Sequence, residues 1–288
     1  MAKTISGERA PGAQRRASDA AGVCVPIISA DAELEAHIAN DRVQTVFQPQ
    51  FNLASGRIVS VEALARLPGC DHAKDLFARA TAAGLSERLS HMVQRKALRI
   101  VGTWQGALAN LGISINVLPE DLARDGFEQS FLAEIDEAGI DPARVTVEIT
   151  ENTLIAEDER IAARLSGLRE RGVKIAVDDF GTGYASLIYL SSLPLDALKI
   201  DRGLIARIES GTRDRIVVRG IISIARELGL ELVIEGVETA GQLDILTEWG
   251  CDLYQGFLGA RPMSEEELVR FVASHQSDES DVLERPSA

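Results

Sequence analysis

The stretch Ile175-Ala176-Val177-Asp178-Asp179 is a short apolar run that ends on two carboxylates. Seven further apolar runs follow the same pattern, and they end on Gln48, Glu62, Asn116, Glu148, Lys199, Glu235 and Gln255. Residues 160–169 and 214–228 have helical spacing of their apolar residues, and Gly172 and Gly229 come after them as helix stops. Short apolar runs that alternate with helical patterns predict βα units and a largely parallel sheet.

The polar residues at the ends of these runs decide between two kinds of parallel sheet. In an open, doubly wound sheet the strand ends spread along a line, whereas in a (β/α)8 barrel they converge on one face. All of the terminal residues except Lys199 are carboxylates or amides, which favours convergence on one site. We therefore expect an α/β fold, a TIM-like (β/α)8 barrel. Ala54-Ser55-Gly56 joins the first two runs as a hairpin, so the first strand is expected to be antiparallel to the second.

Composition limits the partners that the chain can bind. Among 288 residues, 30 Lys and Arg stand against 44 Asp and Glu, and the formal charge is −14. Such a charge repels polymeric nucleic acid and anionic membranes, so neither is expected as a partner.

Three scattered cysteines and the lack of a long apolar run predict a cytoplasmic protein. We expect a disordered N-terminal arm over residues 1–30, a barrel domain over 31–273 and a disordered C-terminal tail over 274–288.

The acidic strand ends suit a hard divalent cation. The set consists of Glu62, Glu148, Asp178, Asp179 and the amide of Asn116, all oxygen donors of the kind that Mg²⁺ or Mn²⁺ prefers. Without a cation, so many carboxylates would repel one another and raise their pKa values. The adjacent aspartates could bridge two ions, which would lower the pKa of a water between them and clamp an in-line phosphoryl displacement.

Lys199 allows two interpretations. A lysine that lines a barrel is costly unless it is paired, so it either forms an ion pair with Asp178 or Asp201 or orients an attacking water. Glu235 and Glu238 follow a later strand and could accept a proton or hold a ligand.

Several segments resemble the EAL domain family, whose members hydrolyse the bacterial second messenger cyclic di-GMP. The resemblance extends over roughly residues 42–273 and depends on the order and spacing of seven segments: Phe47-Gln48-Pro49, Glu62-Ala63-Leu64 with Arg66, residues 147–151, residues 178–184, Lys199-Ile200-Asp201, residues 235–239 and Gln255-Gly256-Phe257. It implies a metal-dependent phosphodiesterase that opens cyclic di-GMP to linear pGpG through two-metal activation of water.

The resemblance also implies a role for each matching residue. Two ions, Mg²⁺ or Mn²⁺, would bind per site, one at Glu62, Asn116, Glu148 and Asp178 and the other at Asp178 with Asp179. Lys199 would contact the catalytic water, and Glu235 would act as general base or metal-site partner. The residues expected to contact cyclic di-GMP are Gln48, Leu64, Arg66, Asp201, Glu238 and Gln255.

The resemblance also implies a regulatory role for Glu151, and the chain departs from the family pattern at a few positions. Glu151 would anchor the loop after the paired aspartates, which in the family couples homodimerisation to activity. Leu118 and Ala185 stand where the family usually has serine, so we expect slower or differently regulated chemistry. Residues 67–81 also diverge from the family, and this divergence is expected to affect contacts to the substrate and not the metal cluster. The alternatives are a catalytically silent cyclic di-GMP receptor that acts through protein contacts and an unrelated barrel hydrolase of another phosphodiester.

Overall fold

The computed structural model describes residues 30–70, 72–151, 153, 159–181, 190 and 193–283, with side chains up to residue 275. Its strands are β1 (Gln44–Asn52), β2 (Ile58–Arg66), β3 (Gly112–Asn116), β4 (Val145–Thr150), β5 (Lys174–Phe180), β6 (Ala197–Ile200), β7 (Glu231–Glu235) and β8 (Leu253–Gln255). Its helices are α1 (Ala32–Ala39), α2 (Ala73–Ala82), α3 (Ser86–Gly102), α4 (Pro119–Ala123), α5 (Phe127–Ala138), α7 (Glu159–Glu170), α9 (Arg202–Ile205), α10 (Thr212–Glu227), α11 (Ala240–Glu248) and α12 (Glu265–Leu283), with 3₁₀ turns η1 (Gly106–Leu108) and η2 (Pro142–Arg144).

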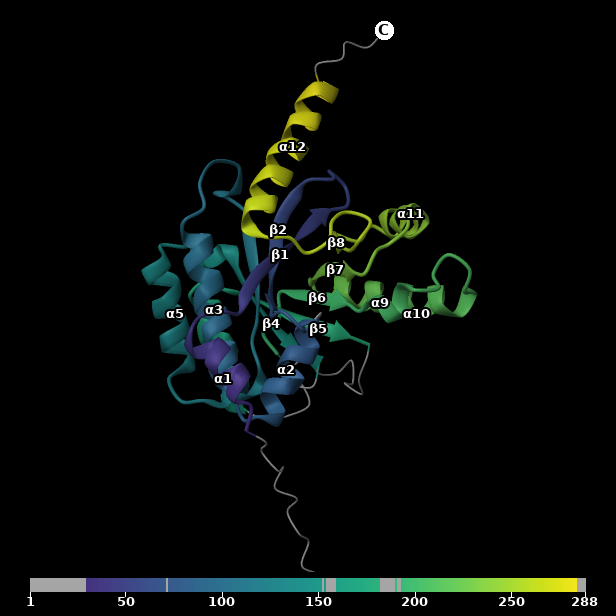
Figure 1. Ribbon diagram of the computed structural model, residues 1–288. Helices are drawn as coiled ribbons and strands as arrows, with labels where there is room; N and C mark the ends of the chain where they lie inside the picture. Colours follow the sequence, from purple (N-terminus) through teal and green to yellow (C-terminus); the bar gives the residue numbers. More distant parts are fainter. Residues whose placement is uncertain are drawn as a thin grey trace, which may run out of the picture.

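The strands form one closed barrel in sequence order, from β1 to β8 and back to β1. Strand β1 is antiparallel to both neighbours, and every other pair is parallel. The hairpin at residues 53–57 explains the orientation of β1, because a short connection can only reverse the chain. The predicted TIM-like barrel with an antiparallel first strand is therefore confirmed, and helices surround it (Figure 1).

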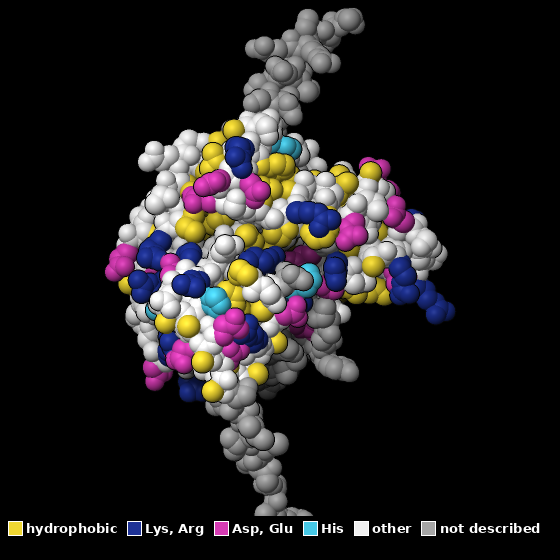
Figure 2. Space-filling view, in the orientation of Figure 1, with side chains coloured by type: hydrophobic (Ala, Val, Ile, Leu, Met, Phe, Trp, Pro, Cys, Tyr) yellow, Lys and Arg dark blue, Asp and Glu magenta, His cyan; other side chains and the backbone are white. Residues whose placement is uncertain are grey.

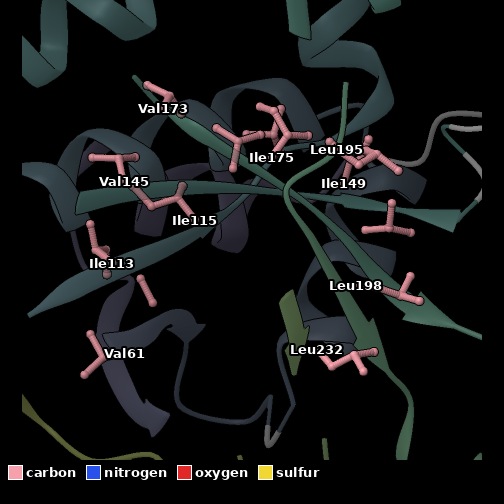
Figure 3. Close-up of a cluster of buried hydrophobic side chains, with 14 of the residues drawn as sticks. Val61, Ile113, Ile115, Val145, Ile149, Val173, Ile175, Leu195, Leu198 and Leu232 are labelled. Carbon is pink, nitrogen blue, oxygen red and sulfur yellow. The ribbon is translucent and has the colours of Figure 1, made fainter. Parts of the chain in front are cut away.

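The main hydrophobic core lies between the barrel wall and the helices. Side chains that point outward from the strands are bulky and fully buried, as Ile113, Val147 and Leu198 illustrate, and Figure 3 shows such residues on several strands. Side chains that point into the barrel are mostly small or polar instead, with Val233 and Leu253 among the larger apolar ones. This division follows from the period of two along a strand, which sends alternate residues to opposite faces.

Two predicted helix stops lie where the sequence indicates. Gly172 follows α7 with a φ of 94°, and Gly229 follows α10 with a φ of 72°. These left-handed conformations cost glycine little, so the chain can turn sharply from each helix into β5 and β7.

The C-terminal helix corrects one expected boundary. Helix α12 runs to Leu283, ten residues beyond the predicted end of the ordered domain at residue 273, and extends from the body beside the β1–β2 hairpin (Figure 1). His275 explains part of this difference, because its ring stacks on Phe271 and its Nε2 lies 3.0 Å from the Gly56 carbonyl oxygen.

The predicted arm over residues 1–30 falls almost wholly outside the described residues. Within the described ranges, no helix combines the length and the apolar character that crossing a bilayer requires.

Candidate active site

Five barrel strands bring four carboxylates around the ammonium group of Lys199, with Glu62 in the middle of β2 and the other residues near the carboxyl ends of their strands. Lys199 Nζ lies 2.7 Å from Glu148 Oε2, 2.8 Å from Glu235 Oε1, 2.9 Å from Asp178 Oδ1 and 3.5 Å from Glu62 Oε2. The lysine is completely buried, and Glu62, Glu148 and Asp178 are each at most 9% exposed. The predicted convergence of the acidic strand ends therefore occurs, and Figure 2 shows acidic side chains set back in a hollow near the centre of the view.

The structure decides between the two partners expected for Lys199. Asp178 is one of its ion-pair partners, whereas Asp201 is not among those described. Asp201 instead caps helix α9, where its Oδ1 accepts a hydrogen bond of 2.8 Å from the Gly203 N–H. Residues two apart on a strand point to the same face, so Asp201 would point the same way as Lys199 if β6 continued. However, β6 ends at Ile200, and Asp201 turns away from the barrel interior at the start of α9.

The electrostatics of the cluster depend on burial and on this single lysine. Burial favours neutral lysine, yet Asp178, Glu148, Glu235 and Glu62 outweigh it and raise the pKa of Lys199 well above its usual value. Burial also raises the pKa of Glu148 strongly, and it raises the pKa of Glu235 to about 8, although Lys199 opposes both shifts. The lysine therefore stays charged, whereas burial works against ionisation of Glu148 and Glu235.

Amide side chains hold Glu62 in a fixed orientation. Asn116 Nδ2 donates to Glu62 Oε1 at 2.9 Å, and Gln255 Nε2 donates to Glu62 Oε2 at 2.7 Å. Gln255 Nε2 also donates to Gln48 Oε1 at 3.0 Å, so β1, β2, β3 and β8 are joined by one polar network. Gln48 pairs with Glu62 across the β1–β2 ladder, which explains how a residue in the middle of β1 reaches the mouth of the barrel.

The residues present fit divalent cations. One group of carboxylate oxygens comes from Glu62, Glu148 and Asp178, and a second comes from Asp178, Asp179 and Glu235, each within 4.8 Å of one another. Among the described residues, Glu148 Oε1 and Asp178 Oδ1 are buried without a hydrogen-bond partner, although Asp178 Oδ1 lies close to Lys199 Nζ. Buried oxygens of this kind are costly unless a positive group satisfies them. Asp178 belongs to both groups, so it could bridge two ions.

Lys74 is a member of the site that the sequence did not reveal. Its Nζ lies 2.9 Å from Asp179 Oδ2, and the lysine comes from α2, within the divergent segment 67–81. Asp179 has a φ of 55°, an uncommon conformation that aspartate tolerates better than most residues. Desolvation works against the charge of Lys74, but Asp179, Asp178 and Asp201 raise its pKa overall. No local motif marks Lys74, because only the fold brings α2 to the end of β5.

The remaining predicted residues surround this centre at the barrel mouth. Glu151 Oε2 accepts a hydrogen bond of 3.0 Å from the Gly181 N–H, two residues after Asp179. Leu64 and Arg66 end β2 and are half-buried, and burial lowers the pKa of Arg66 while Glu62 opposes this shift. Glu238 follows β7 with an exposed side chain, and its N–H donates to Gln242. Residues 182–189, including Ala185, lie outside the described residues.

A second polar network supports Asn116 from outside the barrel. Gln94 Nε2, on α3, donates to the Asn116 carbonyl at 3.3 Å and to Asp121 Oδ2 at 3.1 Å. Asp121 also accepts from the N–H of Leu118 at 3.2 Å, so helix α4 keeps this backbone cap although Leu118 lacks the hydroxyl usual in the family. Burial raises the pKa of Asp121, and its hydrogen bonds oppose that shift. Gln94 and Asp121 were not predicted, because neither lies at a strand end.

Comparison with known proteins agrees with this geometry. The model of the EAL domain family matches residues 31–262. The chain belongs to the EAL domain family. The cyclic di-GMP phosphodiesterase NbdA of Pseudomonas aeruginosa is 35% identical over 256 residues, which cover 86% of this chain and 32% of NbdA. This chain spans less than half the length of the first curated relatives it matches.

Solved EAL domains share the fold. The PaMucR phosphodiesterase in its c-di-GMP complex superposes with a TM-score of 0.77 at 33% identity, covering 82% of this chain and 98% of that one. The manganese and c-di-GMP complex of Klebsiella pneumoniae BlrP1 superposes with a TM-score of 0.70 at 31% identity, covering 77% of this chain and 56% of that one. The EAL domain of this chain therefore resembles domains solved with the dinucleotide and with manganese.

Proposed function

We propose that this EAL domain is a metal-dependent phosphodiesterase that hydrolyses cyclic di-GMP to linear pGpG. The observation that carries the proposal is the convergence of Glu62, Glu148, Asp178 and Glu235 at one mouth of the barrel, with Asp179 beside them. A surplus of buried carboxylates repels an anionic phosphodiester unless cations intervene, so this arrangement makes chemical sense for a metal-assisted reaction.

The proposed metal ligands fall into the two groups of carboxylates. Glu62, Asn116, Glu148 and Asp178 would hold one ion, and Asp178 with Asp179 would hold the other, with Glu235 within reach of the second. When bound, Mg²⁺ or Mn²⁺ supplies Lewis-acid polarisation of the phosphodiester and activation of water. Asn116 and Gln255 orient the Glu62 carboxylate through their hydrogen bonds to its two oxygens.

Lys199 and Glu235 are the proposed catalytic residues. Lys199 keeps its proton on Nζ and fixes the positions of the carboxylates that it contacts, and it can donate to a water at the same centre. Burial raises the pKa of Glu235 to about 8, which favours its protonated form, whereas cations bound beside it would favour the carboxylate that accepts a proton from water. The proposed contacts to the dinucleotide come from side chains at the barrel mouth, namely Gln48, Leu64, Arg66, Asp201, Glu238 and Gln255. Homodimerisation is a further proposal that depends on the family resemblance, and a cytoplasmic location is one that depends on the three scattered cysteines.

A turnover assay with a metal titration tests the proposed function. The chain is incubated with cyclic di-GMP in Mg²⁺ or Mn²⁺, and the products are separated and identified by mass. We expect pGpG to accumulate, and EDTA to stop its formation because the carboxylate cluster would lose its cations. Binding of cyclic di-GMP in saturating Mn²⁺ without any product would contradict the proposal and favour the catalytically silent receptor. Hydrolysis of other phosphodiesters with no preference for cyclic di-GMP would instead favour an unrelated barrel hydrolase.

A further inference from the structure

The barrel is hollow beneath Lys199. A cavity of about 220 Å³ occupies the half of the barrel that lies away from the proposed active site. It extends from the amino-terminal ends of the parallel strands to Glu148 and Lys199 at its inner end. The residues that line it include Ser60, Gly112, Ser114, Thr146, Ala176 and Ala197.

The hollow results from the small size of these inward-facing residues. The interior of a (β/α)8 barrel is ordinarily a packed core of bulky branched side chains. Here small residues are neighbours across the ladders, since Ser60 pairs with Gly112 and Ala176 pairs with Ala197. Neighbouring small side chains cannot fill the space between them, whereas the outward-facing residues of the same strands are large.

The two ends of the cavity differ in character. At the outer end, Lys174 and Glu231 begin β5 and β7, and their side chains are 50% and 42% exposed, so this end borders solvent. At the inner end, Lys199 and Glu148 are completely or almost completely buried. Glu148 Oε1 has no hydrogen-bond partner among the described residues, although the other oxygen of the carboxylate contacts Lys199.

The lining is suited to water. Ser114 and Thr146 place hydroxyl groups along the cavity, and Ser60 and Gln50, which hydrogen-bond to each other, add further polar surface. Empty cavities in proteins are apolar, whereas polar cavities hold waters that hydrogen-bond to buried groups which lack other partners. One water takes up about 30 Å³ in the liquid, so the volume accommodates several.

We propose that this cavity is a water-filled channel which connects the amino-terminal face of the barrel with Lys199 and Glu148. The channel gives the buried ion pair a route to solvent that avoids the mouth where a substrate would enter. The inference depends on the shape and lining of the barrel and not on the proposed function, so it can be tested without an activity assay.

Thiol labelling tests whether small solutes enter the channel. Ser114→Cys places a thiol on the channel lining, and Val147→Cys places one on the opposite face of the next strand, in the hydrophobic core. Ser114 and Val147 are 3% and 0% exposed, so surface exposure alone predicts slow reaction for both. Cys24 and Cys70 are first replaced by serine. Cys251 is retained, because it is buried and burial raises its thiol pKa to about 12.

The reagent is methyl methanethiosulfonate, which is small and uncharged, and rates are measured over a pH range to correct for thiolate fraction. We expect Ser114→Cys to react at least about 100-fold faster than Val147→Cys, because a core thiol reacts only through local unfolding. Urea unfolding of both variants verifies that each is folded during labelling. Equal rates for the two variants would overturn the proposal.

A variant with a filled channel distinguishes the two routes by which the reagent could reach position 114, namely the channel and the mouth of the proposed active site. Ala197→Leu is added to Ser114→Cys, since Ala197 lines the channel below Lys199, and Ala176→Val is the substitute if the leucine variant does not fold. We expect filling to slow labelling by at least about tenfold, because the isobutyl group of leucine or the isopropyl group of valine occupies the space through which the reagent moves. Unchanged labelling would show that the reagent enters from the proposed active site, which would also overturn the channel.

Discussion

Glu62→Ala is expected to reduce turnover of cyclic di-GMP by at least about 10³-fold, since several kcal/mol of transition-state stabilisation depend on a correctly held metal ion. Glu62 is 5% exposed, and both of its carboxylate oxygens accept hydrogen bonds that aim it into the cluster. A methyl group can neither ligate a cation nor replace these bonds. The measurement is the initial rate of pGpG formation in saturating Mn²⁺ for the variant and the parent protein.

A carboxylate outside the site provides the matched control. Glu227, at the end of α10, is exposed and has no part in the cluster described here. Glu227→Gln is therefore expected to hydrolyse cyclic di-GMP at a rate close to that of the parent. A rate for Glu62→Ala that also matches the parent would show that Glu62 is not a metal ligand in the reaction.

Lys199→Met is expected to lower the free energy of unfolding by about 3–5 kcal/mol in EDTA, because removing one partner leaves buried charge uncompensated. Methionine has a similar length, so the loss of charge dominates over the loss of volume. The ammonium contacts four carboxylates, and its pKa is raised well above its usual value. Urea unfolding in EDTA measures the loss, and Mn²⁺ is expected to restore part of it by taking over the role of the positive charge.

Lys174→Met is the matched control for this measurement. Lys174 also points into the barrel, but it lies at the opposite end, is half exposed and has its only described ion pair at 3.9 Å from Glu231. Its replacement is expected to change stability by less than about 1 kcal/mol, as is usual for exposed pairs. An equally small loss for Lys199→Met would mean that the carboxylates around it are protonated and do not need the lysine.

The sequence predicts the barrel and most of the mouth because strand geometry is local. A run such as Ile175-Ala176-Val177 specifies a strand, and its carboxyl end specifies where Asp178 will lie. Gln48 shows the limit of this argument. It was expected at the end of the first strand, but β1 continues to Asn52, and Gln48 reaches the mouth through its antiparallel register with Glu62.

The features that the sequence does not reveal depend on contacts across the barrel or between layers. The four partners of Lys199 come from four other strands, so no local spacing distinguishes them from Asp201, which is only two residues away. Lys74 reaches Asp179 only because α2 folds over the end of β5. No local sequence pattern predicts the cavity either, because it arises from small residues on different strands that become neighbours only when the barrel closes.

Anomalous diffraction from crystals grown in Mn²⁺ tests the central claim most directly, because manganese scatters in a way that identifies its position. The account predicts manganese peaks at the carboxylates of Glu62, Glu148 and Asp178, and at those of Asp178 and Asp179. Peaks only at surface carboxylates, with the ion pairs of Lys199 unchanged and this cluster free of manganese at saturating concentration, would contradict it.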